Sequence, residues 1–319
     1  MNQHMKWKMK IGELGDCLKK ILVIHNPYSG NQKNTKLLKN KLENVGKTYG
    51  YKLKFIKTKA RNDATKIIEK TNKNYDLVLS MGGDGTFNEV VRGNVKRDKP
   101  YTLGHLPVGT TNDLKKSFYL PNNTINAFKS ILSGKVVSYD VMSINGTPFT
   151  YTAGFGKLLD IPYETKKADK QKLGYLAYFN NGIKDIFTRP TKMYNITYQL
   201  NGKIYNDKTS IFLVSNSNRM GGITLYKDAV FNDSKFEVMI AKTNNIIKLA
   251  IGLLQIQLFK KSKYYKIIRT DNIKVLIHDN DYKNWCIDGE KLEDRPEKYD
   301  IKVMKKIKCK VSKYAKNYV

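Results

Sequence analysis

The chain has 319 residues, 40% of them hydrophobic, which is enough to bury a large core in one large domain or, as we expect, two smaller ones. Its 58 lysines and arginines outnumber its 28 aspartates and glutamates, and the net charge of +30 predicts a surface that attracts nucleotides, nucleic acids or anionic lipid headgroups. Three scattered cysteines argue against a disulfide framework and for the reducing cytoplasm, and no apolar stretch approaches the about 20 residues of a spanning helix or resembles a signal peptide.

The first half of the chain alternates between short apolar runs and stretches in which apolar residues recur every three or four positions. The runs predict strands and the recurrent stretches predict helices. We expect strands at residues 21–24, 53–57, 77–80 and 102–106, with helices at 37–49, 64–68, 86–91 and 125–132. This alternation predicts a parallel α/β sheet.

Three polar loops with glycines follow strands of this predicted sheet, at residues 25–30, 82–88 and 107–113. Because the carboxyl ends of parallel strands lie at one edge of a sheet, we expect the loops to converge there. In the second loop, three glycines surround Asp84, so backbone N–H groups can turn toward an anion and the carboxylate toward a metal or a hydroxyl. Taken alone, this loop is best explained as a tight strand-to-helix turn; together, the three loops predict a nucleotide site.

After Asp140 the pattern changes to mainly β structure. Asn145-Gly146 and Asn201-Gly202 predict hairpins. We expect strands at 192–200, 210–214 and 235–241, and helices at 173–186 and 246–259. The last of these helices is apolar and precedes two lysines, a pattern that suits a membrane surface, although we expect a buried domain helix.

Three motifs carry a resemblance to a known family. Gly82–Thr86, Leu106–Asp113 and Asp288–Glu290 resemble the signature motifs of the bacterial diacylglycerol kinase-like lipid kinases, which are related to sphingosine kinases and more distantly to NAD kinases. The segments Asn26–Gly30 and Lys172–Tyr178 also fit that family, and the resemblance covers about residues 21 to 310. The first motif alone is shared with NAD kinases, whereas the three in this order are specific.

The resemblance implies an architecture of two domains. The first, at 21–140, would be an α/β nucleotide-binding domain with a mostly parallel sheet, to which a segment at about 300–319 returns. The second, at 141–299, would be a mainly antiparallel, β-sandwich-like domain that binds the lipid substrate. The γ-phosphate of ATP would pass to a lipid hydroxyl, most simply that of diacylglycerol, giving phosphatidic acid.

The resemblance also assigns site residues. Those that would contact ATP are Asn26, Ser29, Thr58, Gly82, Gly83, Asp84, Gly85, Thr86, Phe87, Asn88 and Thr110. Asp84, Asp113 and Asp140 match aspartates that form a water-linked network around a catalytic Mg²⁺, and Glu290 would be the general base. From the residues alone, Asp113 is a helix N-terminal acid, Asp140 a solvated strand-end residue and Asp288–Glu290 a hairpin turn.

A second, structural Mg²⁺ is implied by the segment Ala229–Phe236. Its ligands would be the carboxylate of Asp233 and the backbone carbonyls of Val230 and Lys235. The sequence departs from the family pattern here, because Ser234 stands where a glycine usually follows the aspartate.

Other functions stay open at this point. The acceptor could be a sphingoid or prenol lipid, or NAD. A nucleic-acid-binding protein would account for the charge and the 21 tyrosines, but no nucleic-acid motif is present and we expect no such partner. As a lipid kinase, the protein would be cytoplasmic and peripherally associated with the inner face of an anionic membrane, and an exposed strand would permit a homodimer.

Overall fold

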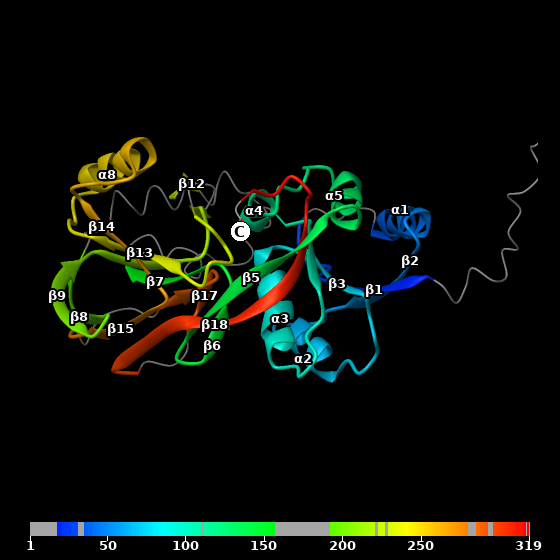
Figure 1. Ribbon diagram of the computed structural model, residues 1–319, viewed down its shortest axis with the longest axis horizontal. Coiled ribbons are helices and arrows are strands. Elements are labelled where there is room, and N and C mark those ends of the chain that lie inside the picture. Colours follow the sequence, from blue (N-terminus) through cyan, green and yellow to red (C-terminus); the bar gives the residue numbers. More distant parts are fainter. Residues whose placement is uncertain are drawn as a thin grey trace, which may run out of the picture.

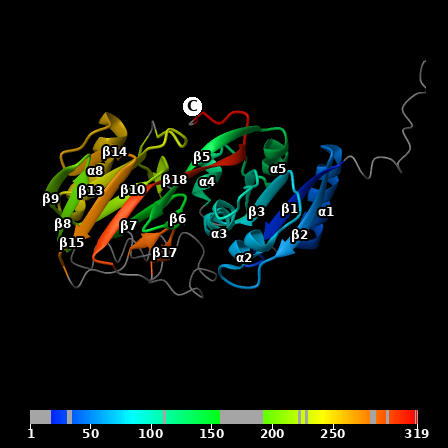
Figure 2. The ribbon, with the colours of Figure 1, turned by 60° about the horizontal axis from the view of Figure 1, so that its bottom comes forward.

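The architecture comes from a computed structural model, which describes residues 18–30, 35–109, 112–156, 192–220, 223–226, 229–279, 285–292, 296–316 and 318. Within these residues, ten strands form one long sheet in the order β2-β1-β3-β4-β18-β15-β8-β9, with β5 and β6 branching from β18. A second sheet has the order β14-β13-β10-β7-β16-β17. The expected fold class, a parallel α/β part followed by an antiparallel sandwich, is confirmed (Figures 1 and 2).

The N-terminal part is built on four parallel strands. They are β1 (Lys19–His25), β2 (Tyr51–Lys57), β3 (Leu77–Gly82) and β4 (Leu103–Pro107). All residues of β3 and β4 are buried, as expected of strands covered on both faces. In Figure 1, α1 (Thr35–Thr48) and α5 (Thr124–Leu132) cover one face, and α2 (Asp63–Lys70) and α3 (Asp84–Val95) cover the other. This arrangement leaves the loops after the strands gathered at one edge.

The helix after the glycine loop starts two residues earlier than expected. We predicted its start at Thr86, but α3 begins at Asp84 with Gly83 as its N-cap. The short helix α4 (Asp113–Ser117) likewise begins directly at an aspartate of the third loop. Both aspartates therefore stand in first turns of helices, where negative charge is stabilised.

Two long strands connect the α/β part to the rest of the chain. β18 (Lys298–Val311) pairs with β15 (Asn272–Ile277) through its first residues and with β4 through Cys309. It also runs antiparallel to β5 (Lys135–Ile144) over most of its length. One continuous sheet therefore crosses from one part to the other, as Figure 1 shows for β5 and β18.

The C-terminal part is a sandwich of two antiparallel sheets. The remaining strands of the long sheet are β6 (Thr147–Phe149), β8 (Tyr194–Leu200) and β9 (Lys203–Thr209). Those of the second sheet are β7 (Thr152–Gly156), β10 (Ile211–Ser215), β13 (Phe236–Ala241), β14 (Tyr265–Thr270), β16 (Cys286–Ile287) and β17 (Glu290–Lys291). A separate pair joins β11 (Arg219–Met220) to β12 (Ile223–Thr224).

Aromatic side chains fill the space between the two sheets. Phe155 and Phe212 stack with ring centroids 5.7 Å apart, and Trp285 lies 4.7 Å from Tyr299 of the facing sheet. All four are almost fully buried. Because each buries a large apolar area, this layer is the main hydrophobic core of the sandwich.

The predicted helix at 246–259 is present as α8 (Ile246–Phe259), on the outside of the sandwich at the end far from β1 and β2 (Figures 1 and 2). We expected a buried domain helix, and for one face this is wrong, since several large apolar side chains of α8 are exposed. The other predicted helix, at 173–186, lies outside the described residues.

Candidate active site

The three polar loops meet at the carboxyl edge of the parallel strands. The backbone N–H of Gly83 donates to the hydroxyl of Ser29 at 3.3 Å, and the side-chain amide of Asn26 donates to the hydroxyl of Thr86 at 3.2 Å. The N–H of Val108 donates to the carbonyl of Gly82 at 2.9 Å. The loops that the sequence separates by tens of residues therefore form one surface.

Glycines allow these loops to pack backbone to backbone. Gly30 has φ +67°, and a Cβ there would lie 1.9 Å from the carbonyl oxygen of Val108. A Cβ on Gly109 would lie 2.8 Å from the Cα of Gly83. In contrast, apart from its two chain neighbours and the backbone of its own helix, none of the described residues comes within 4 Å of the place where a Cβ of Gly85 would stand. The loops are thus tight against each other and open in front of the first turn of α3, where backbone N–H groups favour an anion.

The other predicted ATP contacts lie at or behind this surface. Thr58 is buried at the end of β2, where its N–H donates to the carbonyl of His25 at 2.9 Å. Asn88 is buried, and its Oδ1 atom has no hydrogen-bond partner among the described residues. Phe87 packs in the core against His105 and Phe118, so its side chain supports the loop from behind. Thr110 lies outside the described residues.

Asp84 ties the second loop to the third. Its carboxylate accepts from the N–H groups of Asp113 at 2.9 Å and Leu114 at 3.4 Å, the start of α4. Burial, and to a lesser degree the negative charges of Asp113 and Asp288, raise the pKa of Asp84 to about 7. Nε2 of His105 lies 3.7 Å away, but burial lowers the pKa of His105 to about 3, so the ring is neutral and forms no ion pair with Asp84.

Asp113 connects the nucleotide loops to the sandwich. The hydroxyl of Tyr151 donates to its Oδ2 at 2.5 Å, and Nε of Arg219 lies 3.9 Å from its Oδ1. Tyr151 precedes β7, and the Arg219 side chain comes from β11, so both partners belong to the C-terminal part. The carboxylate is almost fully buried at the boundary between the two parts.

Asp140 has different neighbours from the other two aspartates. Its Oδ2 accepts from the N–H of Ser234 at 2.6 Å, and Nζ of Lys306 lies 3.9 Å from its Oδ1. Burial raises the pKa of Asp140 from its ordinary value. The described residues contain no group of three His, Cys, Asp or Glu side chains close enough to bind one metal directly. A network of all three aspartates therefore needs water between its members, and it stays a prediction.

Asp233 is bound by an arginine. The guanidinium of Arg269 forms a close ion pair with its Oδ2, and Nε of Arg269 lies 3.7 Å from Glu237. Ser234, in the position of the family glycine, has the left-handed φ of 61°. Because the guanidinium already supplies the positive charge that an ion would bring, the set of Val230, Asp233 and Lys235 fits a second Mg²⁺ poorly.

Asp288 fixes the hairpin that carries Glu290. Asp288 and Gly289 form the turn between β16 and β17, with φ of 49° and 83°. The carboxylate of Asp288 accepts from the backbone N–H groups of Thr150, Tyr151 and Thr152, each at 2.9 Å. Since Tyr151 also binds Asp113, a chain of hydrogen bonds joins the glycine loop to this hairpin.

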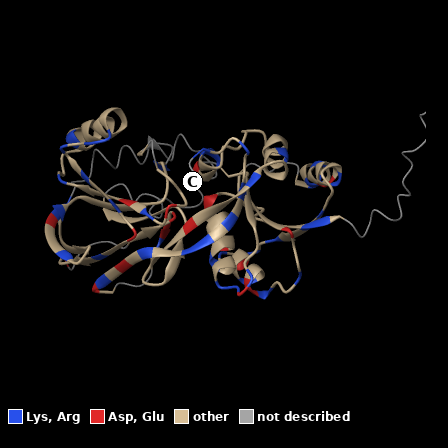
Figure 3. Cartoon of the chain, viewed as in Figure 1, with Lys and Arg blue, Asp and Glu red and all other residues tan. Residues whose placement is uncertain are grey.

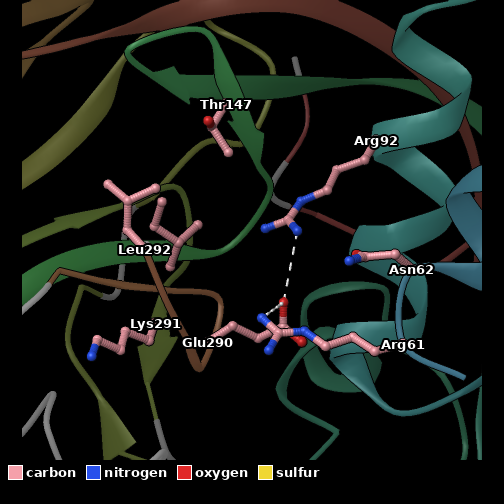
Figure 4. A pocket seen from close by; sticks show the side chains of 8 residues that line it. Arg61, Asn62, Arg92, Thr147, Glu290, Lys291 and Leu292 are labelled. Carbon is pink, nitrogen blue, oxygen red and sulfur yellow. Dashed lines mark ion pairs between the residues drawn. The ribbon is translucent and has the colours of Figure 1, made fainter. Parts of the chain in front are cut away.

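Glu290 lines a pocket of about 300 Å³ between the two parts of the chain (Figure 4). Its Oε2 lies 3.0 Å from Nη2 of Arg61 and 3.7 Å from Nη1 of Arg92. Arg61 precedes α2 and Arg92 belongs to α3, so the α/β part supplies both guanidiniums and the sandwich supplies the carboxylate. The rest of the wall on the sandwich side is lined by Thr147, Ile287, Lys291 and Leu292.

Comparisons with known proteins place this site in a family. The profile of the diacylglycerol kinase catalytic domain matches residues 20–144. The diacylglycerol kinase of Bacillus subtilis is 34% identical over 233 residues, which are 72% of this chain and 76% of that protein. The chain belongs to the diacylglycerol kinase family. The diacylglycerol kinase of Staphylococcus aureus is 29% identical over 252 residues, 78% of this chain and 79% of that one.

Solved structures agree with the family fold. A crystal structure of a diacylglycerol kinase from Bacillus anthracis superposes with a TM-score of 0.73 at 22% identity, over 92% of this chain and 97% of that chain. Another structure from that organism reaches a TM-score of 0.78 at 23% identity, over 93% and 98%. Along the described residues of this family member, no helix is both long and apolar enough to cross a membrane.

Sequence reasoning assigned no role to three side chains of this candidate site. It placed Asp288 in a family motif and in a hairpin turn, but it gave the Asp288 carboxylate no role of its own. It assigned no role to Arg61 or Arg92, and nothing local could have found them, because their partner Glu290 lies about two hundred residues further along the chain.

Proposed function

We propose that this protein transfers the γ-phosphoryl group of ATP to the free hydroxyl of diacylglycerol, with phosphatidic acid and ADP as products. The names of the Bacillus subtilis and Staphylococcus aureus relatives support the choice of acceptor. The observation that carries the proposal is the hydrogen-bonded chain from Asp84 through Asp113, Tyr151 and Asp288 to the hairpin of Glu290, since it couples an anion-binding loop to a carboxylate base.

The nucleotide would lie on the surface made by the three loops. Asn26, Ser29 and Gly83 would contact the phosphates there, and the open space before Gly85 would admit them to the first turn of α3. Thr58, Asn88 and Thr110 would complete the contacts. Phosphoryl transfer depends on positioning and charge neutralisation more than on covalent help, which is what such a surface offers.

The aspartates fit a divalent cation held through water. Asp84, Asp113 and Asp288 are acidic groups near one another; Asp113 is buried and the other two are partly buried. The negative charges of Asp113 and Asp288 are part of the cause of the raised pKa of Asp84, after its burial. Mg²⁺, when bound by Asp84 and Asp113 with Asp140 as a further member, would neutralise charge on the phosphates. A structural ion at Asp233 would have to displace Arg269.

Glu290 would act as the general base. It would take the proton of the lipid hydroxyl while that oxygen bonds to the γ-phosphorus and the bond from this phosphorus to the β–γ bridging oxygen breaks. Among the described residues, Arg61 and Arg92 form ion pairs with Glu290, and they would stabilise negative charge on the transferred group. Asp288 would position the base without touching the reactants.

With phosphatidic acid as its product, the protein would act in phospholipid biosynthesis. Its acceptor resides in a bilayer, so we propose a cytoplasmic protein that associates peripherally with the inner face of the membrane. Lysines and arginines are spread over both parts of the chain in Figure 3, and each lysine near an anionic surface contributes about 1 kcal/mol.

A comparison of four acceptors tests the proposal. ATP consumption by the full chain would be measured with short-chain diacylglycerol, sphingosine, undecaprenol and NAD in turn. We expect turnover with diacylglycerol and much slower turnover with the others. Turnover that is absent, independent of lipid or fastest with NAD would refute the assignment of a lipid acceptor.

A further inference from the structure

One face of α8 is apolar and exposed. Ile247, Ile251, Leu254 and Leu258 follow one another at intervals of four, three and four residues, which places them on one face of the helix. Their exposed fractions are 64%, 42%, 54% and 61%, and that of the adjoining Phe259 is 64%. Four large apolar side chains thus share one outward face, and Phe259 adds a fifth exposed apolar side chain at its C-terminal end. We call these five residues the apolar patch; such patches on soluble proteins mark interaction surfaces.

The opposite face of α8 is held against the sandwich. Leu249 and Ile256 are 2% and 4% exposed. A Cβ on Gly252 would lie 2.6 Å from the ring of Tyr265, so the helix rests directly on β14. The hydroxyl of Tyr265 also donates to the carbonyl of Leu249 at 3.1 Å. The helix therefore cannot turn its apolar patch inward without losing these contacts.

The segment that carries the patch is rich in exposed lysines and has no acidic residue. Residues 242 to 263 contain no aspartate or glutamate. The exposed lysines of this segment are Lys242, Lys248, Lys260, Lys261 and Lys263. Figure 3 shows basic residues at α8 accordingly. An apolar strip beside ammonium groups complements a lipid bilayer, whose headgroup phosphates lie above its hydrocarbon core.

We propose that α8 is the membrane-docking surface of this protein, with its apolar patch inserted into the interface of an anionic bilayer and its lysines at the headgroup phosphates. At 14 residues the helix is shorter than the about 20 that a spanning segment needs, so it would lie in the plane of the interface. A second copy of the chain is a poorer occupant, because a two-fold interface through this patch would bring the lysines of both copies together.

The inference goes beyond the proposed function, because it concerns where the protein docks and holds for any lipid acceptor. Its test needs no ATP and no turnover. The full chain would be mixed with vesicles of phosphatidylcholine containing one third phosphatidylglycerol, or of phosphatidylcholine alone, and the bound fraction measured by sedimentation. A failed kinase assay would leave this measurement untouched.

We expect Leu254→Glu or Leu258→Glu to lower the partition coefficient at least about tenfold, since each removes a leucine that docking would bury in the bilayer and adds a negative charge. Lys260→Gln and Lys261→Gln should each lower it about fivefold on the anionic vesicles and hardly at all on phosphatidylcholine. The matched control is Ile204→Glu, which changes an isoleucine on β9 that is 70% exposed. It should bind like the wild type.

The proposal would be overturned if Leu254→Glu bound the vesicles as well as the wild type does. It would also be overturned if Ile204→Glu lost as much vesicle binding as Leu254→Glu. So would a vesicle-free dimer that Leu254→Glu converts to a monomer, because the patch would then be a subunit interface. Thermal melting would check that each variant folds, and Leu258→Gln at the exposed last turn would replace any glutamate variant that does not. If the α8 variants keep their turnover on a dissolved short-chain acceptor, their loss of vesicle binding is a loss of docking and not of catalysis.

Discussion

The hydroxyl of Tyr151 lies 2.5 Å from Oδ2 of Asp113 and donates a hydrogen bond to it across the boundary between the sandwich and the nucleotide loops. The backbone N–H of the same tyrosine donates to Asp288. One residue therefore holds both the aspartate behind the phosphate surface and the turn that presents Glu290.

Tyr151→Phe should separate these two elements. The buried carboxylate of Asp113 would lose a hydrogen-bond donor, and we expect this loss to lower the free energy of unfolding by about 1–3 kcal/mol. We expect kcat to fall about tenfold, because the base hairpin is positioned less well, with KM for ATP nearly unchanged. Steady-state kinetics and denaturant unfolding would measure both. Tyr49→Phe, at an exposed tyrosine at the end of α1, is the control; an unchanged kcat in Tyr151→Phe would contradict the positioning role.

Glu290→Gln should abolish catalysis but not folding. The glutamate is 27% exposed in its side chain and pairs with the half-exposed Arg61, so loss of the ion pair should change the free energy of unfolding by less than about 1 kcal/mol. Loss of a general base should lower kcat by about 10²–10⁴-fold. Full activity in this variant, or a large loss of stability, would argue that the residue is structural.

Gly30→Ala should damage the nucleotide surface. The new Cβ would stand 1.9 Å from the carbonyl oxygen of Val108, at a positive φ that alanine rarely adopts. We expect KM for ATP to rise at least about tenfold and the free energy of unfolding to fall by about 2 kcal/mol. Gly202→Ala also has a positive φ, yet nothing among the described residues stands near its Cβ. It should lose about 1 kcal/mol of stability and keep its KM.

His105 should make folding sensitive to acid. Its pKa is lowered to about 3 in the folded protein by burial, so between this value and about 6.5 the unfolded chain binds more protons. Stability should therefore fall as the pH falls, by about 3 kcal/mol from this group between about pH 7 and about pH 4. The free energy of unfolding of His105→Gln, measured in metal-free buffer, should depend less steeply on pH over this range. Parallel curves for the two proteins would show that the ring is protonated when folded.

Arg269→Gln tests whether Arg269 takes the place of a structural Mg²⁺ at Asp233. In the wild type the guanidinium compensates Asp233, so we expect Mg²⁺ to change the melting temperature little. The variant leaves that carboxylate without its partner, and Mg²⁺ should then raise its melting temperature by several degrees. The comparison is made by thermal unfolding with Mg²⁺ or with a chelator. A large effect of Mg²⁺ on the wild type alone would favour the structural ion of the family pattern.

Much of the fold could be predicted because its signals are local. Buried runs such as Leu77–Ser80 and the apolar spacing of α5 and α8 are readable within ten or fifteen residues. The three glycine loops were recognisable for the same reason, since tight backbone turns demand glycine at particular positions. Parallel strands then require these loops to lie at one edge of the sheet.

What the sequence by itself determined is thus the order of elements, the class of fold and the chemistry of the phosphate-binding loops. Only the tertiary structure decided which distant groups meet. Tyr151 and Asp288 are 137 residues apart, and Arg61 meets Glu290 across the boundary of the two parts. It also decided that α8 buries one face and exposes the other, because helical spacing reveals an apolar face but not what covers it. Such pairings depend on how β18 and β5 connect the two parts of the chain through one sheet, and no local pattern encodes that geometry.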